Sequence, residues 1–279
     1  MSEPAPLTGH TEDVACFVVE ALPGVLALDF DGTLTEIVND PDEAVLTVER
    51  RHVLRRVARV PGLRTVVLSG RRRRDVESRL DVPGVAVVGN HGFEIEGWEM
   101  PLADRYRSAL TGFLADLEAL RDARFRIEDK GQTATLHLQE TRADAARDRL
   151  REELASRLEL FQSSRSERRP PAEREPGGTR DLVRLRLHPG KATLEIRPDV
   201  GWNKSSALLY LLNVWGIGRA RCFYAGDDLT DECVFAELSN GVTVKVGEGE
   251  SAARFRAHDP SEIYALLVEI VGRSQGRRR

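Results

Sequence analysis

The chain has 279 residues, of which 41% are hydrophobic and 31% charged, and this balance excludes a mostly disordered or collagen-like protein. Its 41 basic and 45 acidic residues leave a formal net charge of −4, so no strong field draws the protein toward nucleic acid or anionic lipid. No stretch approaches the ~20 apolar residues of a membrane-spanning helix, and we expect no membrane segment.

Short apolar runs separated by helical patterns predict a doubly wound α/β domain with a parallel sheet. The strands fall into two blocks, residues 1–100 and 199–279, which we expect to form one catalytic core. The predicted strands are 25–29, 65–69, 85–88, 222–225 and 242–246, and the predicted helical stripes are 46–57, 207–215 and 263–270.

The middle block, residues 101–198, predicts an inserted α+β cap with an antiparallel sheet and two helices on one side, because its strand patterns alternate polar and apolar residues. Between its halves, residues 163–180 hold three Pro, two Gly and five Arg, which predicts a mobile surface loop. The predicted helices are 102–120 and 146–158, and the predicted strands are 125–127, 133–138, 183–187 and 192–196.

Two predicted strands run directly into acidic clusters. The first ends in Asp29-Phe30-Asp31-Gly32 and the second in Gly226-Asp227-Asp228, with Asp231 three residues further on. Because ligand sites of open α/β sheets lie at the carboxyl ends of the strands, we expect the clusters to converge. Carboxylate oxygens suit Mg²⁺, whereas the sequence has no His-rich or Cys-rich set for zinc. An ordinary acidic turn is the alternative for either cluster alone.

Two further segments offer groups for a phosphate. A third strand ends in Ser69-Gly70, which supplies a hydroxyl and a backbone amide, and Lys204 opens a predicted helix. The N-terminus of a helix favours anions through its dipole and free amides. We therefore predict that Ser69, Gly70 and Lys204 bind phosphate.

Taken in chain order, these motifs resemble the four motifs of the haloacid dehalogenase superfamily of phosphohydrolases: Asp29-Phe30-Asp31-Gly32-Thr33, Ser69, Lys204 and Gly226-Asp227-Asp228 with Asp231. More local segments are similar to the trehalose-6-phosphate phosphatase family. They are Leu68-Ser69-Gly70-Arg71, Gly89-Asn90-His91-Gly92, Ile127-Glu128-Asp129-Lys130-Gly131, His188-Pro189-Gly190, Leu194-Glu195-Ile196-Arg197-Pro198 and Gly226-Asp227-Asp228-Leu229-Thr230-Asp231-Glu232.

The resemblance implies hydrolysis of trehalose 6-phosphate through an aspartyl-phosphate. Asp29 would be the nucleophile, and Asp31 would be the acid and base while binding Mg²⁺ through its backbone carbonyl. Asp227 would also bind the metal, with Asp228 and Asp231 as supporting carboxylates. The resemblance further implies a functional link to trehalose-6-phosphate synthase in trehalose biosynthesis.

Six residues are expected to contact the substrate, either from the matched motifs or from the polar face of the cap. They are Arg71, Asn90, His91, Glu128, Lys130 and Glu195. A salt bridge of Lys130 with either glutamate, without a role in specificity, is the alternative. The sequence departs from the family where Gln139 stands in place of an arginine.

Three other functions compete with this interpretation. Another capped phosphatase would act on sucrose phosphate or a mannosyl phosphate, because the cap selects the substrate. A non-catalytic partner of a sugar-phosphate synthase would be marked by loss of Asp29 or Asp31, and both are present. A nucleic-acid binder would use the Arg72–Arg74 and Arg277–Arg279 runs, against which the net charge and the lack of interleaved aromatics argue.

Residue usage adds two expectations. The cysteines Cys16, Cys222 and Cys233 are odd in number and widely spaced, which indicates a reducing, cytoplasmic location. Only four of the 41 basic residues are lysine, and a lysine retained against this bias is one that the wider guanidinium of arginine could not replace. Of these, Lys191 and Lys245 lie in strand patterns and are interpreted as structural.

Overall fold

The computed structural model describes residues 3–38, 40–120, 122–138, 144–167, 183–190 and 193–277. The chain divides into two compact units, a larger one made of Met1–Trp98 with Trp202–Arg279 and a smaller one made of Glu99–Gly201. Each unit has its own sheet. Within the described residues, no helix is both long enough and apolar enough to cross a membrane.

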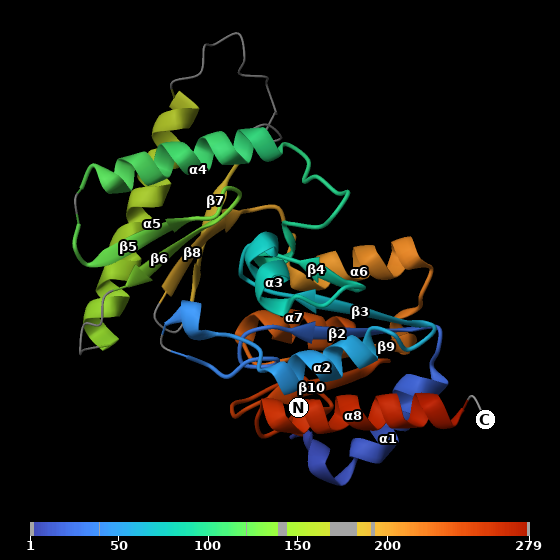
Figure 1. The fold of residues 1–279 in the computed structure, drawn as a ribbon. Coiled ribbons are helices and arrows are strands. Elements are labelled where there is room, and N and C mark those ends of the chain that lie inside the picture. Colours follow the sequence, from blue (N-terminus) through green and yellow to red (C-terminus); the bar gives the residue numbers. More distant parts are fainter. Residues whose placement is uncertain are drawn as a thin grey trace. The chain divides into compact units, whose positions relative to one another are not determined.

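A seven-stranded parallel sheet forms the centre of the larger unit (Figure 1). Its order is β1-β11-β10-β9-β2-β3-β4, so β2, which ends in Asp29, has a strand on each side. The strands are β1 (Ala5–Pro6), β2 (Gly24–Asp29), β3 (Leu63–Leu68), β4 (Val85–Val88), β9 (Cys222–Gly226), β10 (Val242–Val246) and β11 (Phe255–Ala257).

Helices cover both faces of this sheet, which is why its strands are apolar on both sides. Leu26 and Leu28 of β2 enter a core with α1, α2, α3 and α8, whereas Val25 and Ala27 enter a second core with α6 and α7. The helices are α1 (Thr11–Glu20), α2 (Val48–Val57), α3 (Arg73–Leu80), α6 (Lys204–Trp215), α7 (Glu232–Glu237) and α8 (Pro260–Gly276), with the 3-10 turns η1 (Leu7–Gly9), η2 (Pro41–Glu43), η3 (Asn90–Gly92), η5 (Arg219–Arg221) and η6 (Leu229–Asp231).

The start of α6 is fixed by its capping residue. The Asn203 side chain accepts a hydrogen bond of 3.1 Å from the Ser206 backbone amide, which satisfies one of the free donors in the first turn. The helix ends at Gly216, whose φ of 65° lies in the left-handed region that glycine adopts without strain. Capping therefore places Lys204 in the first turn of α6.

The smaller unit consists of a four-stranded antiparallel sheet and two helices. One sheet face carries the buried Leu136, Leu194 and Ile196, and the other carries alternating polar residues such as Thr135 and Glu195. The strand order is β5-β6-β8-β7, with β5 (Phe125–Asp129), β6 (Ala134–Leu138), β7 (Leu185–Pro189) and β8 (Thr193–Pro198), and the helices are α4 (Ala103–Glu118) and α5 (Asp144–Glu167).

A stack of two tryptophans lies where the chain leaves and re-enters the larger unit. The rings of Trp98 and Trp202 are 4.5 Å apart between centroids and 12° from parallel. The Trp202 indole also donates a 2.7 Å hydrogen bond to the carbonyl of Gly92. Both ends of the smaller unit thus begin beside one aromatic stack.

The predicted fold class is confirmed: a parallel sheet with helices on both faces and a separate antiparallel sheet. The sequence patterns missed the helices α1, α3 and α7 and the edge strands β1 and β11; the two strands are too short to show a period. The prediction that a loop begins at residue 163 was wrong, because α5 continues to Glu167. No proline occurs in this segment before Pro170, so nothing in the backbone ends the helix earlier. The remainder, 168–180, and Gln139 lie outside the described residues.

Candidate active site

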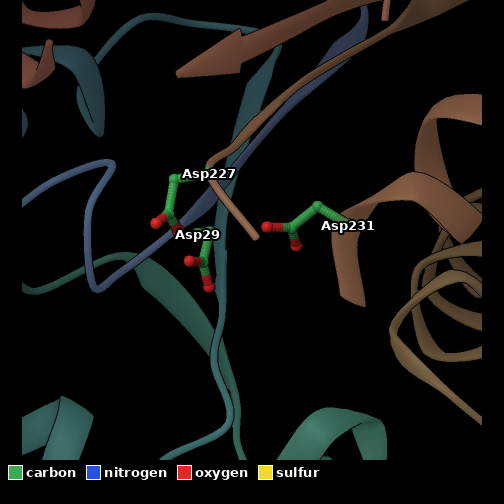
Figure 2. A group of neighbouring side chains, drawn as sticks. All are labelled: Asp29, Asp227 and Asp231. Atoms are coloured by element: carbon green, nitrogen blue, oxygen red, sulfur yellow. The ribbon is translucent and has the colours of Figure 1, made fainter. Parts of the chain in front are cut away.

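Three carboxylates meet at the carboxyl ends of neighbouring strands. Asp29 ends β2, Asp227 follows β9, and Asp231 lies in η6 just beyond it. Each offers one oxygen, and these three atoms lie within 4.8 Å of one another (Figure 2). The two acidic clusters seen in the sequence therefore converge at one edge of the sheet.

Lys204 joins two of these carboxylates. Its ammonium donates hydrogen bonds of 2.8 Å to Asp29 Oδ1 and 2.8 Å to Asp231 Oδ1, and only 3% of the residue is exposed. Burial by itself would lower the pKa of Lys204, but the charges of Asp231 and Asp29 raise it above its ordinary value. The lysine is thus held as a cation against the strand-end carboxylates.

Asp231 is completely buried and is held from three directions. Its Oδ1 accepts from Lys204 and, at 2.5 Å, from the hydroxyl of Tyr224, and its Oδ2 accepts from the backbone amide of Asp228 at 3.0 Å. Nothing in the sequence indicates a role for the Tyr224 hydroxyl beyond its place in a buried strand. These donors offset the cost of burying the carboxylate.

Glycine is required at two positions for the carboxylates to come this close. Gly32 has a φ of +72°, and a Cβ there would lie 2.3 Å from Asp227 Oδ2. A Cβ on Gly226 would lie 2.4 Å from the carboxyl carbon of Asp231. Any side chain at either position would push the carboxylates apart.

Burial also changes how easily the carboxyl groups ionise. Burial raises the pKa of Asp29 well above its usual range, Lys204 opposes the change, and the charges of Asp231 and Asp227 add to it. Burial and the charge of Asp231 raise the pKa of Asp227 to about 6. A nearby cation stabilises the ionised form of such clustered carboxylates.

Asp31 lies outside the cluster of Asp29, Asp227 and Asp231, and 44% of its side chain is exposed. The guanidinium of Arg71 holds it with hydrogen bonds of 2.8 Å from Nε to Oδ2 and 2.8 Å from Nη2 to Oδ1. Arg71 also pairs with Asp75 at 3.2 Å. The paired, fork-like geometry fixes the direction of the Asp31 carboxylate.

The loop after β3 is hydrogen-bonded to the loop after β4. The Ser69 hydroxyl accepts a 3.1 Å hydrogen bond from the Arg71 amide, and the Ser69 carbonyl accepts one of 2.9 Å from the His91 amide. Asn90 and His91 both have positive φ, 54° and 56°, and the Asn90 amide donates to the Arg71 carbonyl at 2.6 Å. A Cβ on Gly70 would meet the His91 ring at 2.4 Å. The structure thus places Asn90 and His91 behind the Ser69–Gly70 turn.

The predicted substrate contacts of the cap lie in the smaller unit. Strand pairing sets Glu128, Thr135, Glu195 and His188 opposite one another in a row across its sheet. Glu128 accepts a 2.8 Å hydrogen bond from His137, which lowers the pKa of Glu128. Lys130 follows β5 in the turn toward β6, and its amide donates 2.9 Å to the Thr133 carbonyl.

The second glutamate of this row is held by a buried arginine. Glu195 accepts hydrogen bonds from Nε and Nη2 of Arg197, the first at 2.7 Å, and only 7% of Arg197 is exposed. The contact keeps the Glu195 carboxylate on the polar side of the sheet. Sequence alternation predicted this face but not the Arg197 contact.

A solved haloacid dehalogenase-like hydrolase of Bacteroides thetaiotaomicron has the same fold, with a TM-score of 0.54 at 18% identity over 90% of this chain and 98% of that one. Residues 27–164 match the sequence model of the trehalose-phosphatase family. A trehalose 6-phosphate phosphatase of Zea mays is 32% identical over 263 residues, covering 91% of this chain and 71% of that protein. A probable trehalose-phosphate phosphatase of Oryza sativa subsp. japonica is 33% identical over 88% of this chain and 69% of its own length.

A solved trehalose-6-phosphate phosphatase of Aspergillus fumigatus has the same fold, with a TM-score of 0.62 at 20% identity over 97% of this chain and 100% of that one. The chain therefore belongs to the trehalose-phosphatase family. Its predicted family resemblance is confirmed.

Replacing Tyr224 with phenylalanine should lower the free energy of unfolding by about 1.5–3 kcal/mol, because it removes a donor to a buried carboxylate. Urea unfolding measures the change through the midpoint at constant slope. Tyr264→Phe is the matched control, since the Tyr264 hydroxyl donates to the neutral carbonyl of Leu34 at 3.1 Å and should cost about 1 kcal/mol. Equal losses in the two variants would contradict a special contribution from the Asp231 contact.

Proposed function

We propose that the protein is a Mg²⁺-dependent phosphatase that hydrolyses trehalose 6-phosphate to trehalose and phosphate in trehalose biosynthesis. The observation that carries the proposal is the buried Asp29 carboxylate, which lies at a strand end against the Lys204 ammonium in a chain of the trehalose-phosphatase family. A carboxylate in this setting can attack a phosphoryl group, and the cation can hold the phosphoryl oxygens.

In the first step, an oxygen of Asp29 forms a bond to phosphorus while the bond from phosphorus to the sugar oxygen breaks. Asp31 gives a proton to the departing sugar oxygen, so trehalose leaves as an alcohol and Asp29 becomes an aspartyl-phosphate. Ser69, Gly70 and Lys204 hold the three phosphoryl oxygens during transfer.

In the second step, water attacks the phosphorus of the aspartyl-phosphate and Asp31 takes a proton from it. The bond between phosphorus and Asp29 breaks, which releases phosphate and restores the carboxylate. The first step leaves Asp31 as a carboxylate, and the guanidinium of Arg71 would pair with it in that form.

The three clustered carboxylates fit a divalent cation. With all three ionised, the charge of Lys204 leaves two negative charges in a buried cluster of oxygen atoms that lie within 4.8 Å of one another. Asp29 and Asp227 would hold Mg²⁺ with the Asp31 carbonyl, while Asp228 and Asp231 support the site. Bound there, the cation offsets the repulsion between the substrate phosphate and Asp29.

The smaller unit would select the sugar. A sugar presents hydroxyls, and the polar face of this unit presents Glu128 and Glu195 in one row with Lys130 close by in sequence. In the larger unit, Arg71, Asn90 and His91 are the residues proposed to contact the substrate. A site that pairs with hydroxyls discriminates strongly against substrates that lack them.

Asp29→Asn should abolish turnover while leaving the fold intact, because an amide is not a nucleophile for phosphorus. Phosphate release from trehalose 6-phosphate measures the loss, and circular dichroism confirms the fold. Asp42→Asn, at an exposed carboxylate, is the control and should remain active. Retention of more than about a tenth of wild-type kcat would contradict the covalent mechanism.

Removal of divalent ions should abolish phosphate release, and Mg²⁺ should restore it. The physical reason is that the repulsion between phosphate and Asp29 is then no longer offset. The measurement is kcat after exhaustive EDTA treatment, with the circular dichroism spectrum as the control for folding. Full activity in the metal-free protein would be incompatible with the proposed site.

Lys130→Ala and Glu195→Ala should each lower kcat/KM for trehalose 6-phosphate by ~10²-fold, about 2.7 kcal/mol of transition-state binding. Both should hydrolyse p-nitrophenyl phosphate almost as fast as wild type, because that substrate has no sugar. Glu195→Gln should show the same split while keeping a hydrogen-bond partner for the buried Arg197. Glu153→Ala on α5 is the control for an exposed glutamate.

The pattern of losses decides between substrate binding and structure. Equal losses on both substrates would indicate structural damage in the smaller unit. No loss on either would remove Lys130 and Glu195 from the substrate site, and phosphate release from sucrose and mannosyl phosphates would then identify the sugar.

A further inference from the structure

Lys245 is a buried cation that the proposed chemistry does not use. It lies on β10, only 5% of the residue is exposed, and its ammonium donates a hydrogen bond to the backbone carbonyl of Asp227. Among the described residues, no carboxylate forms an ion pair with it. A buried charge without a counter-ion costs folding free energy, so its presence calls for a benefit other than stability.

Lys245 is one of only four lysines among the 41 basic residues of the chain. Its partner across the β10–β9 pair is Gly226, where even a Cβ would lie 2.4 Å from the carboxyl carbon of Asp231. A planar guanidinium is wider than the compact ammonium that donates to the Asp227 carbonyl. Lys204, the other buried lysine of the described residues, contacts the carboxylates of Asp29 and Asp231.

We propose that Lys245 is a positioning residue that fixes Asp227 for binding of the divalent cation. The backbone of Asp227 is tied to β10 through Lys245, and its carboxylate is confined from the other side by Gly32. With both ends held, the carboxylate stays beside Asp29. The proposal rests on the proposed function only for the role of Asp227 as a metal ligand.

Arg256 provides a matched control. It is the partner of Lys245 across the β10–β11 pair, and its guanidinium donates to the backbone carbonyls of Gly247 and Gly249, the latter at 2.6 Å. It therefore makes the same kind of contact one strand further from the carboxylates. A general effect of losing a cation-to-carbonyl bond should appear equally in both variants.

The experiment is Mn²⁺ binding to the substrate-free protein, measured by electron paramagnetic resonance for wild type, Lys245→Met and Arg256→Met. Lys245→Met should raise the Kd for Mn²⁺ by about tenfold, the usual effect of removing a group that orients a metal ligand. Arg256→Met should leave it unchanged. A Kd that is unchanged or lower in Lys245→Met would overturn the proposal, since loss of charge alone favours cation binding.

Two further measurements separate positioning from structural damage. Saturating Mg²⁺ should restore kcat in Lys245→Met while the Mg²⁺ concentration for half-maximal activity rises, whereas a kcat that stays low would overturn the proposal. If Lys245→Met does not fold, Lys245→Gln replaces it and should also bind Mn²⁺ more weakly than wild type. Absence of Mn²⁺ binding in the wild type would overturn both this proposal and the metal site.

Failure of the proposed function gives a different result. A wild-type protein that binds Mn²⁺ but does not hydrolyse trehalose 6-phosphate would refute the substrate, while the comparison of Kd values would still decide the role of Lys245.

Discussion

The ammonium group of Lys204 lies between the carboxylates of Asp29 and Asp231, 2.8 Å from an oxygen of each, and all three residues are almost entirely buried. Without the lysine, two neighbouring carboxylates would be left buried with no counter-ion, which is strongly unfavourable. Two other interactions support this contact: Asn203 caps the helix that carries Lys204, and the Tyr224 hydroxyl donates a hydrogen bond to Asp231. The centre of the site is thus arranged around one charge.

The residues predicted from the sequence are those whose position follows from local order along the chain. Asp29, Ser69 and Asp227 each come directly after an apolar run, and the strands of a parallel sheet end at a common edge, so their proximity follows from the fold class. Lys204 follows a capping residue at the start of a helix, which is equally local.

The contacts that could not be predicted depend on distance and register between separate segments. Nothing in the sequence around Tyr224 indicates that its hydroxyl meets Asp231, or that Lys245 reaches the Asp227 carbonyl from the neighbouring strand. The pairing of Asp31 with Arg71 joins residues 40 positions apart. These contacts depend on the order of the strands in the sheet and on glycines that let side chains approach closely. One sequence alone specifies neither.

The rings of Trp98 and Trp202, 4.5 Å apart between centroids, stack at the two points where the chain leaves and re-enters the larger unit. A linker of a few residues could therefore join them directly, and the seven-stranded sheet would become one continuous domain with its cores unchanged. In evolutionary terms the smaller unit is a domain inserted at one point of the larger unit. An ancestor could have gained it, and a descendant could exchange it, through a single insertion point without altering a strand of the catalytic sheet.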